Sequence, residues 1–523
     1  MDNITVIKNF MAENSLEYLL VNSTNEFLVE YNTLEENSRY KLTNFSGSTG
    51  EALITPDTIF LFVDGRYHIQ ADQEVCHEKV TVVKLQTGQK YLDELLKKIP
   101  TNKTLGLFAK KNSQNKIKFL KENRSIKLLN IDPLDTKINI DISQNIELDK
   151  KYTGLTAEEK IAKISQNLAD NEALYITDPD EVSYLFNMRN FSRNYSSKIK
   201  AKAIIFKDNS ILFTEDKLGE LEEFLVNINK KVYVDENTIN GFDYNLLGKN
   251  AISIETNPVK TMKSQKNDVE INHLKSAFER TDKAVKAIRE YIYNNENISE
   301  FDIANQLEQE FKKQGALGLS FKSIVAKDKN SALAHYSKSS KDEIIKDGSL
   351  VLIDCGAYFE GGLATDITRV FVKGTPTELQ KKIYTTVLKA FLLGFNYAKK
   401  HIQRPLIGFE IDKEVHKFFN SQDLDEFVFN HGLGHGIGIN VHEYPPNLST
   451  NEIAKTPILD GMVFSIEPGL YKNGFFGVRL ENSCYFKDND IHSFVNMNYE
   501  RKLINFEMLT DEELEELANF EVI

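Results

Sequence analysis

The sequence has little of what a secreted, membrane-spanning or nucleic-acid-binding protein needs. Its 523 residues include three cysteines, no tryptophan and 11 prolines. The cysteines (Cys76, Cys355 and Cys484) are few and widely spaced, which argues against a disulfide scaffold and for a reducing compartment. Asp and Glu outnumber Lys and Arg by 77 to 64, and the net charge of −13 disfavours a nucleic-acid or anionic-membrane partner.

Long apolar runs are missing as well. No run approaches the ~18 residues that a membrane span requires, and polar residues interrupt the first turns of the sequence where a signal peptide would be apolar. The chain is 41% hydrophobic and 27% charged, which is typical of a globular protein with ample material for buried cores. We therefore expect a cytoplasmic protein without a membrane segment.

One basic segment stands out from this acidic background. Between Lys97 and Lys127 there are ten Lys or Arg residues and one acid. Sites for single-stranded nucleic acid usually interleave such cations with aromatic side chains, and few aromatics occur here. We interpret the run as a solvated helix face and expect no nucleic-acid partner.

The first 260 residues contain a degenerate internal repeat of β-rich and helical segments. Each copy has a short β-run, a helical stretch and two further β-runs separated by a turn. The first copy comprises 18–21, a stretch around Phe27 and 51–67, and the second comprises 173–177, 180–189 and 201–214. Strands that alternate with helices predict two α/β units, with a boundary near Asp132-Pro133.

A third region of different composition begins near residue 264. Asn267 and Glu270 have the spacing of a capping box that starts a long amphipathic helix, and Thr510 and Glu513 can cap a short final helix. Between them, β-runs alternate with helical stretches near 378–400 and 410–420; the β-runs are 349–359, 363–372, 462–467 and 476–486. Because the connections within pairs of β-runs are short, we expect an α+β domain with largely antiparallel pairing.

Two of these β-runs carry one aspartate each among apolar residues. Asp354 lies in the first run and Asp366 in the second, and residues 360–362 separate the runs. A lone carboxylate among apolar neighbours costs several kcal/mol of desolvation unless a cation or hydrogen bonds neutralise it. The simpler alternatives are an exposed hairpin edge, or an ion pair between Asp366 and Arg369.

The segment HGLGHGIGINVHE (431–443) contains three of the ten histidines. His431 and His435 have the i,i+4 spacing of a zinc-binding helix, but the glutamate of H-E-x-x-H is missing and the glycines disfavour a helix. We expect a Gly-rich loop that passes close to a metal or a substrate. A single histidine in such a segment is more often structural, whereas three of them, including His442, favour a functional role.

Two glutamates complete the candidate site. Glu467 ends a β-run at a Pro-Gly turn, and Arg479 and Glu481 share one strand face at i,i+2. An ordinary ion pair between Arg479 and Glu481 is the alternative. Taken together, four carboxylates and a histidine on separate β-elements suit a pair of divalent ions. Because oxygen ligands dominate, Mn²⁺ fits best, with Co²⁺ or Zn²⁺ as alternatives.

These five residues resemble, in order and context, the metal ligands of the pita-bread metallopeptidases, which include methionine aminopeptidase, prolidase and aminopeptidase P. The phrases HGLGHG, EPGLY and VRLEN are similar to the family's own. The resemblance implies the ligand set Asp354, Asp366, His435, Glu467 and Glu481.

The resemblance extends over the whole chain. Residues 42–67 and 180–189 resemble the first and second amino-terminal domains of the three-domain, cytosolic-type aminopeptidase P. This implies two creatinase/prolidase-like α/β domains followed by a pita-bread catalytic domain, with the ranges 1–132, 133–258 and 259–523. It also implies a homodimer.

The resemblance further implies individual roles. Asp354 would hold one ion, His435 and Glu467 the other, and Asp366 and Glu481 would bridge the two. Glu467 would pass a proton from water to the leaving proline nitrogen. His442 would stabilise the oxyanion, with His335 and His431 lining the proline subsite. The predicted catalytic residues are Glu467, His442, His335 and His431; the predicted substrate-binding residues are Arg66, His335, His435, His442, Glu467 and Arg479. For Arg66 a plain surface ion pair is the alternative.

The function that follows is a dinuclear aminopeptidase that removes the first residue from peptides with proline in second position. One alternative is a prolidase restricted to Xaa-Pro dipeptides, which must bind a free carboxylate beside the proline. The other is a non-catalytic pita-bread module that binds peptides. Proteins of that last kind usually lack several of the metal ligands, and all five are present here.

Overall fold

The computed structural model describes residues 2–86, 88–136, 141–255, 257–401 and 405–520. The chain forms two compact units, each assembled from more than one segment. Unit 1 comprises Met1–Glu147, Leu155–Met188 and Ile199–Val259, and unit 2 comprises Leu148–Gly154, Arg189–Lys198 and Lys260–Ile523. The domain ranges predicted for the amino-terminal half, 1–132 and 133–258, stay a prediction, because most of both ranges belongs to unit 1.

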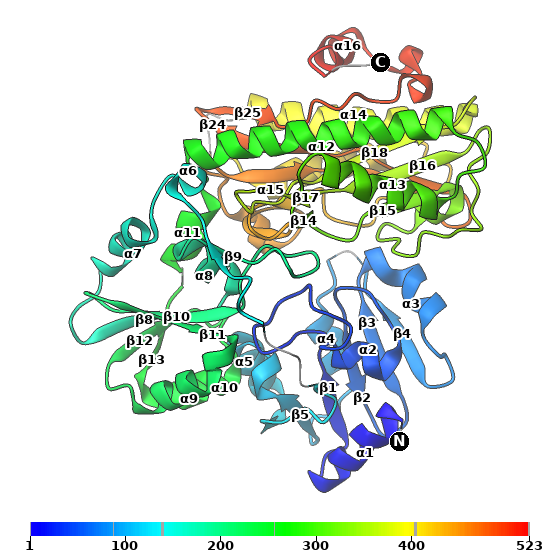
Figure 1. Cartoon of the computed structure of the whole chain (residues 1–523). Helices are drawn as coiled ribbons and strands as arrows, with labels where there is room; N and C mark the ends of the chain where they lie inside the picture. Colours follow the sequence, from blue (N-terminus) through cyan, green and yellow to red (C-terminus); the bar gives the residue numbers. More distant parts are fainter. Residues whose placement is uncertain (1, 87, 137–140, 256, 402–404, 521–523) are drawn as a thin grey trace. The chain divides into compact units, whose positions relative to one another are not determined.

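Unit 1 contains two mixed sheets that repeat one strand order (Figure 1). The sheet β4-β3-β2-β1-β5-β6 consists of β1 (Tyr18–Val21), β2 (Glu51–Ile54), β3 (Ile59–Val63), β4 (Val80–Lys84), β5 (Thr104–Phe108) and β6 (Ser125–Leu129). The sheet β11-β10-β8-β12-β13 consists of β8 (Glu172–Ile176), β10 (Ala201–Ile205), β11 (Ser210–Thr214), β12 (Lys231–Val234) and β13 (Ala251–Ser253).

The pairing pattern of the two sheets confirms the internal repeat. In each, two antiparallel pairs (β3-β2-β1 and β11-β10-β8) are followed by two parallel pairs (β1-β5-β6 and β8-β12-β13). The helices of unit 1 are α1 (Asn3–Glu13), α2 (Ser38–Thr43), α3 (His68–Glu74), α4 (Tyr91–Leu96), α5 (Gln114–Asn123), α7 (Ala157–Ser165), α8 (Pro179–Leu185), α9 (Leu218–Asn227) and α10 (Gly241–Leu247). This alternation of strands and helices is the predicted α/β class.

The helix predicted around Phe27 is absent, and that prediction is wrong. The Asn25 side chain accepts the N–H of Phe27 at 3.0 Å, and Leu28 has a φ of 56°. Asn side chains that bond to the nearby backbone in this way compete with helix formation. In this copy of the repeat the helix instead begins at Ser38.

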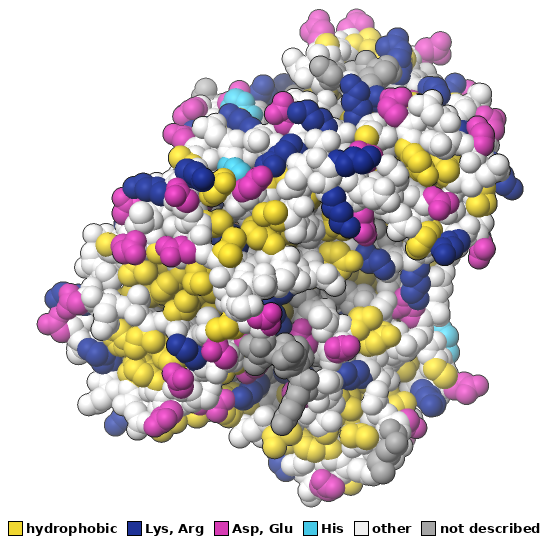
Figure 2. Space-filling view, viewed as in Figure 1, with side chains coloured by type: hydrophobic (Ala, Val, Ile, Leu, Met, Phe, Trp, Pro, Cys, Tyr) yellow, Lys and Arg dark blue, Asp and Glu magenta, His cyan; other side chains and the backbone are white. Residues whose placement is uncertain are grey.

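The basic run is also more buried than predicted. Lys111 pairs with Asp132 at 2.7 Å and Lys116 pairs with Glu51 at 3.2 Å. Lys111 is only 4% exposed, so the interpretation of the run as a solvated face is wrong at these positions. On the visible face of the molecule, cationic and anionic side chains are interspersed (Figure 2).

Unit 2 has the predicted α+β composition. Its long helices are α12 (Asp268–Asn294), α13 (Glu300–Lys313), α14 (Glu378–Lys400) and α15 (Gly408–Asn420). The short ones are α6 (Lys150–Thr153), α16 (Asp511–Leu517) and α11 (Pro258–Ser264), whose first two residues belong to unit 1. The capping boxes of Asn267 with Glu270 and of Thr510 with Glu513 are both present. Helix α12 packs against α13, and α14 packs against α15.

The strands of unit 2 form two main antiparallel sheets, as the short connections predicted. The three-stranded sheet β15-β16-β18 contains β15 (Ile324–Lys327), β16 (Leu350–Cys355) and β18 (Ile367–Val372). The five-stranded sheet β20-β19-β21-β24-β25 contains β19 (Gly434–Gly436), β20 (Glu443–Leu448), β21 (Val463–Ile466), β24 (Asn482–Lys487) and β25 (Asp490–Ser493). Two-stranded pairs are formed by β14 (Gly318–Leu319) with β17 (Ala357–Tyr358), and by β22 (Gly469–Lys472) with β23 (Phe476–Arg479).

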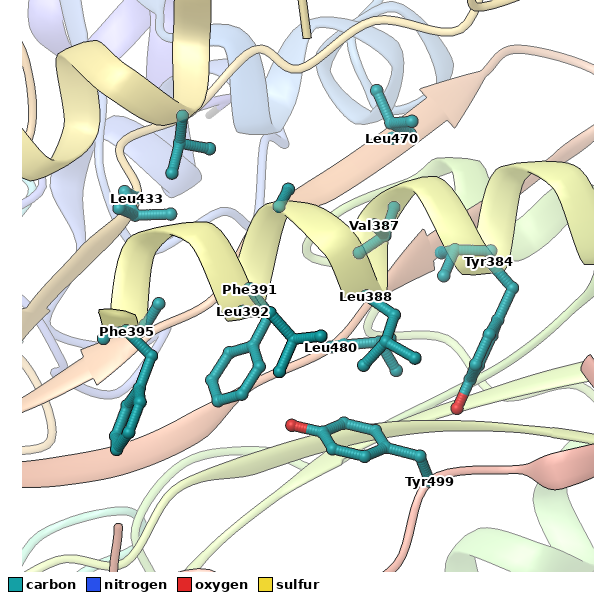
Figure 3. Packing of buried hydrophobic residues seen from close by; sticks show 14 of the residues in the cluster. Tyr384, Val387, Leu388, Phe391, Leu392, Phe395, Leu433, Leu470, Leu480 and Tyr499 are labelled. Carbon is teal, nitrogen blue, oxygen red and sulfur yellow. The ribbon is translucent and has the colours of Figure 1, made fainter. Parts of the chain in front are cut away.

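The core of unit 2 lies around α14. Figure 3 shows Val387, Leu388 and Phe391 of this helix packed beside Leu433 and Leu480. Leu480 lies between Arg479 and Glu481 in sequence. Because neighbouring residues of an extended chain point to opposite sides, burying this leucine against α14 directs Arg479 and Glu481 away from the core.

Within the described ranges, no helix combines the length with the apolar character that crossing a membrane requires.

Candidate metal centre

The two aspartates lie at the same end of an antiparallel strand pair. Asp354 is on β16 and faces Thr368 of β18, and Asp366 directly precedes β18. Both are buried, at 8% and 4% exposure. The simpler alternative of an Asp366–Arg369 ion pair is wrong, because the Arg369 guanidinium donates to backbone carbonyls, among them that of Glu481 at 2.7 Å.

The glutamates and the histidine lie at one end of the five-stranded sheet. Glu467 follows β21 and Glu481 precedes β24, next to the pair formed by Ile466 and Asn482. His435 is on β19, where its N–H donates to Ser465 Oγ at 3.0 Å. The segment 431–442 is not helical, as its glycines predicted.

Thr368 connects the two sheets at the site. Its hydroxyl donates to Glu481 Oε2 at 2.8 Å, and its carbonyl accepts the Glu481 N–H at 3.2 Å. Thr368 stands two residues after Asp366 on one strand, so the two side chains share a face. Ser465 has the same relation to Glu467 and donates to its Oε1 at 3.2 Å. These two supporting residues were not predicted, although the i,i+2 alternation around each acid marks them.

The structure brings the five predicted ligands together. Ligand atoms of Asp366, His435 and Glu481 all lie within 4.8 Å of one another. His435 Nε2 is 3.6 Å from Asp366 Oδ2 and 3.3 Å from Glu467 Oε1. Asp354 is joined to this group through Arg479, whose Nη2 donates to Asp354 Oδ2 and whose Nε lies 3.9 Å from Glu467 Oε2.

Three carboxylate oxygens of the group are buried without a hydrogen-bond partner in the described part of the chain. They are Asp354 Oδ1, Asp366 Oδ1 and Glu481 Oε1. A buried anionic oxygen without a donor is unfavourable unless a cation occupies the space beside it. The donor set of four carboxylates and one imidazole, with its open oxygens, therefore fits divalent ions that prefer oxygen ligands.

The pKa values of these carboxyl groups are also consistent with a site for divalent ions. Burial raises the pKa of Asp366 and of Glu481 well above the usual range, and the neighbouring carboxylates raise both further. Burial also raises the pKa of Glu467 to about 7, although Arg479 opposes the shift. The chain's own cations do not balance the negative charge that these acids carry when ionised.

Arg479 does not form the ion pair with Glu481 that was the alternative. Its guanidinium donates to Asp354, to Thr368 Oγ1 at 3.2 Å and to the Tyr471 hydroxyl at 2.8 Å. Tyr471 Oη lies 2.8 Å from His431 Nε2. Tyr471 thus links the predicted metal ligands to a predicted pocket histidine. It was not predicted as a site residue, even though it ends the recognised EPGLY segment.

The other predicted histidines lie in loops of the same unit. The His442 ring stands edge-on to the His435 ring, with centroids 4.4 Å apart and an interplanar angle of 77°. His335 is half-buried in the turn after residues Asp328–Ala332. That turn is attached to β23 through Ser331, whose hydroxyl accepts the Gly477 N–H at 2.8 Å.

Arg66 belongs to unit 1, whereas the predicted metal ligands belong to unit 2. It forms a bidentate pair with Asp64, with Nε–Oδ1 at 2.9 Å and Nη2–Oδ2 at 2.8 Å, and it donates to Thr49 Oγ1 at 3.2 Å. The ion-pair alternative is therefore present, and a substrate contact of Arg66 stays a prediction.

Comparison with known proteins identifies the class to which this fold and site belong. Residues 272–488 match the profile of "Metallopeptidase family M24", and residues 4–136 and 139–229 each match a "Creatinase/Prolidase N-terminal domain". Residues 272–488 therefore match an M24 metallopeptidase domain, and the fold consists of two creatinase/prolidase N-terminal domains followed by a pita-bread domain.

Relatives match over nearly the full chain. Xaa-Pro aminopeptidase 1 of Dictyostelium discoideum is 27% identical, over 97% of this chain and 90% of the relative. A probable Xaa-Pro aminopeptidase P of Coprinopsis cinerea is 27% identical, over 98% and 92%. The crystal structure of a Caenorhabditis elegans X-prolyl aminopeptidase, described as a cytosolic enzyme with a di-nuclear active site, has a TM-score of 0.85 at 21% identity and covers 96% of this chain and 92% of that one. This last match shows the shared fold.

Proposed function

We propose that this protein is a metal-dependent Xaa-Pro aminopeptidase, which hydrolyses the bond between the first residue of a peptide and a proline in second position. The observation that carries the proposal is the buried group of five ligands with three unpartnered carboxylate oxygens. Its relatives named Xaa-Pro aminopeptidase, which match over almost the whole chain, support the choice of substrate.

Within this proposal each ligand has a place. Asp354 would hold one ion, His435 and Glu467 would hold the other, and Asp366 and Glu481 would contribute to both. The excess of carboxylate ligands favours Mn²⁺, with Co²⁺ or Zn²⁺ as alternatives. When bound, two such ions supply a Lewis acid for the substrate carbonyl and increase the acidity of a water molecule.

The chain itself supplies the proton transfers. Burial raises the pKa of Glu467 to about 7, and we assign to Glu467 the transfer of a proton from the attacking water to the proline nitrogen. His442 lies against His435, where its ring can donate to the oxygen on which negative charge develops.

Recognition of proline requires a shaped pocket, because the proline nitrogen has no N–H to offer in a hydrogen bond. We assign the walls of this pocket to His335 and His431. Arg479 is 2% exposed and its nitrogens are engaged by Asp354, Thr368 and Tyr471, which favours an action on substrate through those groups. Arg66 is kept as a further substrate contact.

We also propose a cytoplasmic homodimer. The low cysteine content favours a reducing compartment, and the Caenorhabditis elegans neighbour is described as cytosolic. The homodimer rests on the sequence resemblance to cytosolic-type aminopeptidase P.

The test compares three peptide types with purified protein, Mn²⁺ and matched chelator controls. We expect release of the first residue from Xaa-Pro-Xaa peptides, loss of the activity with chelator, and little action on Met-Ala-Xaa peptides. Hydrolysis of Xaa-Pro dipeptides alone would identify a prolidase. Metal binding without hydrolysis of any peptide would point to a binding module and contradict the proposal.

A further inference from the structure

A second buried carboxylate lies directly beside the predicted oxyanion donor. Glu443 follows His442 in sequence, and its side chain is fully buried between two lysines. Lys266 Nζ donates to Glu443 Oε1 at 2.5 Å, and Lys263 Nζ lies 2.8 Å from Oε2. The side chains of the two lysines are 2% and 5% exposed. We call these three residues the Glu443 clamp.

The backbone around the clamp is built to admit this carboxylate. A Cβ at Gly438 would lie 2.1 Å from Glu443 Oε2, so any other residue there would collide with the carboxylate. Glu443 also pairs with Gly436 at the point where the register of β19 and β20 shifts next to His435. The clamp therefore fixes the start of β20 relative to the strand that carries a metal ligand.

The lysines come from the segment that leads into the long helix α12. The Lys266 N–H donates to the Gly461 carbonyl at 2.8 Å, which holds this segment against the loop before β21. Burial alone favours the neutral form of Glu443, but the two ammonium groups lower its pKa to about 2. The carboxylate is therefore ionised and held by charge-assisted contacts throughout the working pH range.

The fixed position of the Glu443 side chain also determines the direction of the His442 side chain. Successive side chains of an extended segment point in opposite directions, so a carboxylate held by the lysines sends His442 to the other side, where its ring meets His435. Reactions of this kind are sensitive to displacements of about 1 Å in a catalytic group.

We propose that Glu443 is a positioning residue that acts through His442, and that Lys263 and Lys266 hold it in place for this purpose. The inference rests on the proposed aminopeptidase function. It assigns to the segment before α12 a part in catalysis without contact to substrate or metal.

The first test measures the kinetic effect of Glu443→Gln in two backgrounds, the wild-type protein and the His442→Ala variant. We expect Glu443→Gln to lower kcat by about 10- to 100-fold, with KM changed less than about twofold and both metal ions retained. In a His442→Ala background, the same substitution should cause no further loss of kcat. An unchanged kcat, a loss that adds fully to that of His442→Ala, or a loss explained by missing metal would overturn the proposal.

Asp132→Asn is the matched control. Asp132 is a buried partner of Lys111 in unit 1, at 2.7 Å, so its substitution removes a comparable buried charge away from the site. It should lower the melting temperature without changing kcat. If Glu443→Gln does not fold, Lys266→Arg is the second variant, because it keeps a cation in the Glu443 clamp. We expect Lys266→Arg to lower kcat by a smaller factor than Glu443→Gln, again with little change in KM. An unchanged kcat in Lys266→Arg would then count against the proposal.

A readout without substrate separates this inference from the proposed function. The ¹⁵N signals of the His442 ring, assigned by their loss in His442→Ala, should shift in Glu443→Gln loaded with diamagnetic Zn²⁺ and stay in place in Asp132→Asn loaded in the same way. An unchanged His442 signal would overturn the positioning role even if the wild-type protein hydrolysed no peptide.

Discussion

Unit 2 holds buried carboxylates in two contrasting settings. At the Glu443 clamp, two lysines surround one acid and lower its pKa to about 2. At the metal centre, burial and mutual repulsion raise the pKa of Asp366 and Glu481 well above the usual range. The first setting is balanced by the chain's own cations, and the second is not.

The difference in charge balance separates a structural carboxylate, Glu443, from carboxylates with a predicted function in metal binding, Asp366 and Glu481. Leaving an ionised carboxylate buried without a partner costs several kcal/mol, and the clamp shows that the chain can bring lysines to such a place. At the metal centre it provides Arg479 and His435 and leaves three buried oxygens open. Protons or metal ions taken from solvent must therefore neutralise these acids.

The largest expected effect comes from removing charge at the shared ligands. Asp366→Asn or Glu481→Gln should lower turnover by more than about 100-fold, because substitutions outside the ligand shell already cost 10- to 100-fold. Steady-state rates and elemental analysis check this. Full metal occupancy together with near-wild-type rates in either variant would show that the carboxylates of the metal centre are not needed for metal binding and turnover.

A smaller loss is expected when the ligands are left intact. His442→Ala should lower kcat by about 100-fold with little change in KM, since a donor to the oxyanion acts mainly in the transition state. The measurement is a kinetic comparison at saturating Mn²⁺. A variant in which only KM rises would reassign His442 to substrate binding.

His335 tests whether the predicted pocket is separate from the metal centre. We expect His335→Ala to lower kcat/KM for Ala-Pro-Ala by about 10-fold, with both ions still bound. If excess Mn²⁺ restores the rate, His335 supports the ligands and the pocket assignment is wrong.

The smallest effect concerns the pH dependence of stability in chelator-treated protein. Burial raises the pKa of Glu467 from 4.5 to about 7. A group with a raised pKa in the folded state contributes stability below its unfolded pKa and loses that contribution as pH rises through the folded value. The melting temperature should therefore fall by a few degrees between about pH 5 and about pH 8, and bound metal should suppress the fall.

Substitutions of one carboxylate from each setting test this difference in charge balance directly. In metal-free protein near pH 8, Asp366→Asn should melt above wild type because it relieves repulsion, whereas Glu443→Gln should melt below it because it unbalances two lysines. Calorimetry of the three proteins checks both signs. A lower melting temperature in both variants would mean that the two carboxylate settings do not differ in charge balance.

Patterns that depend on local sequence predicted most of the fold. The capping residues of α12, the two-copy repeat of unit 1 and the antiparallel pairs of unit 2 are all present. The helix predicted near Phe27 failed because the Asn25 side chain bonds to the local backbone there, a competition that hydrophobic periodicity does not register.

The partners of charged side chains were predicted less well. The five ligands stand out in sequence because each is an acid or histidine among apolar or glycine residues. Arg369 and Arg479 instead bind groups far away in sequence: Arg369 donates to the Met497 carbonyl at 2.7 Å, and Arg479 donates to Asp354. Only the folded chain determines which acceptors meet a long cationic side chain.

We expect the buried acids of unit 2 to take up two divalent ions that activate the protein. The most direct measurement is calorimetric titration of Mn²⁺ into chelator-treated protein in buffers of different ionisation enthalpy, with Xaa-Pro-Xaa hydrolysis followed at each ratio. We predict two ions per chain, release of protons as the raised-pKa carboxyls ionise, and activity that appears with binding. Fewer than two ions, or full hydrolysis without added metal, would contradict the account.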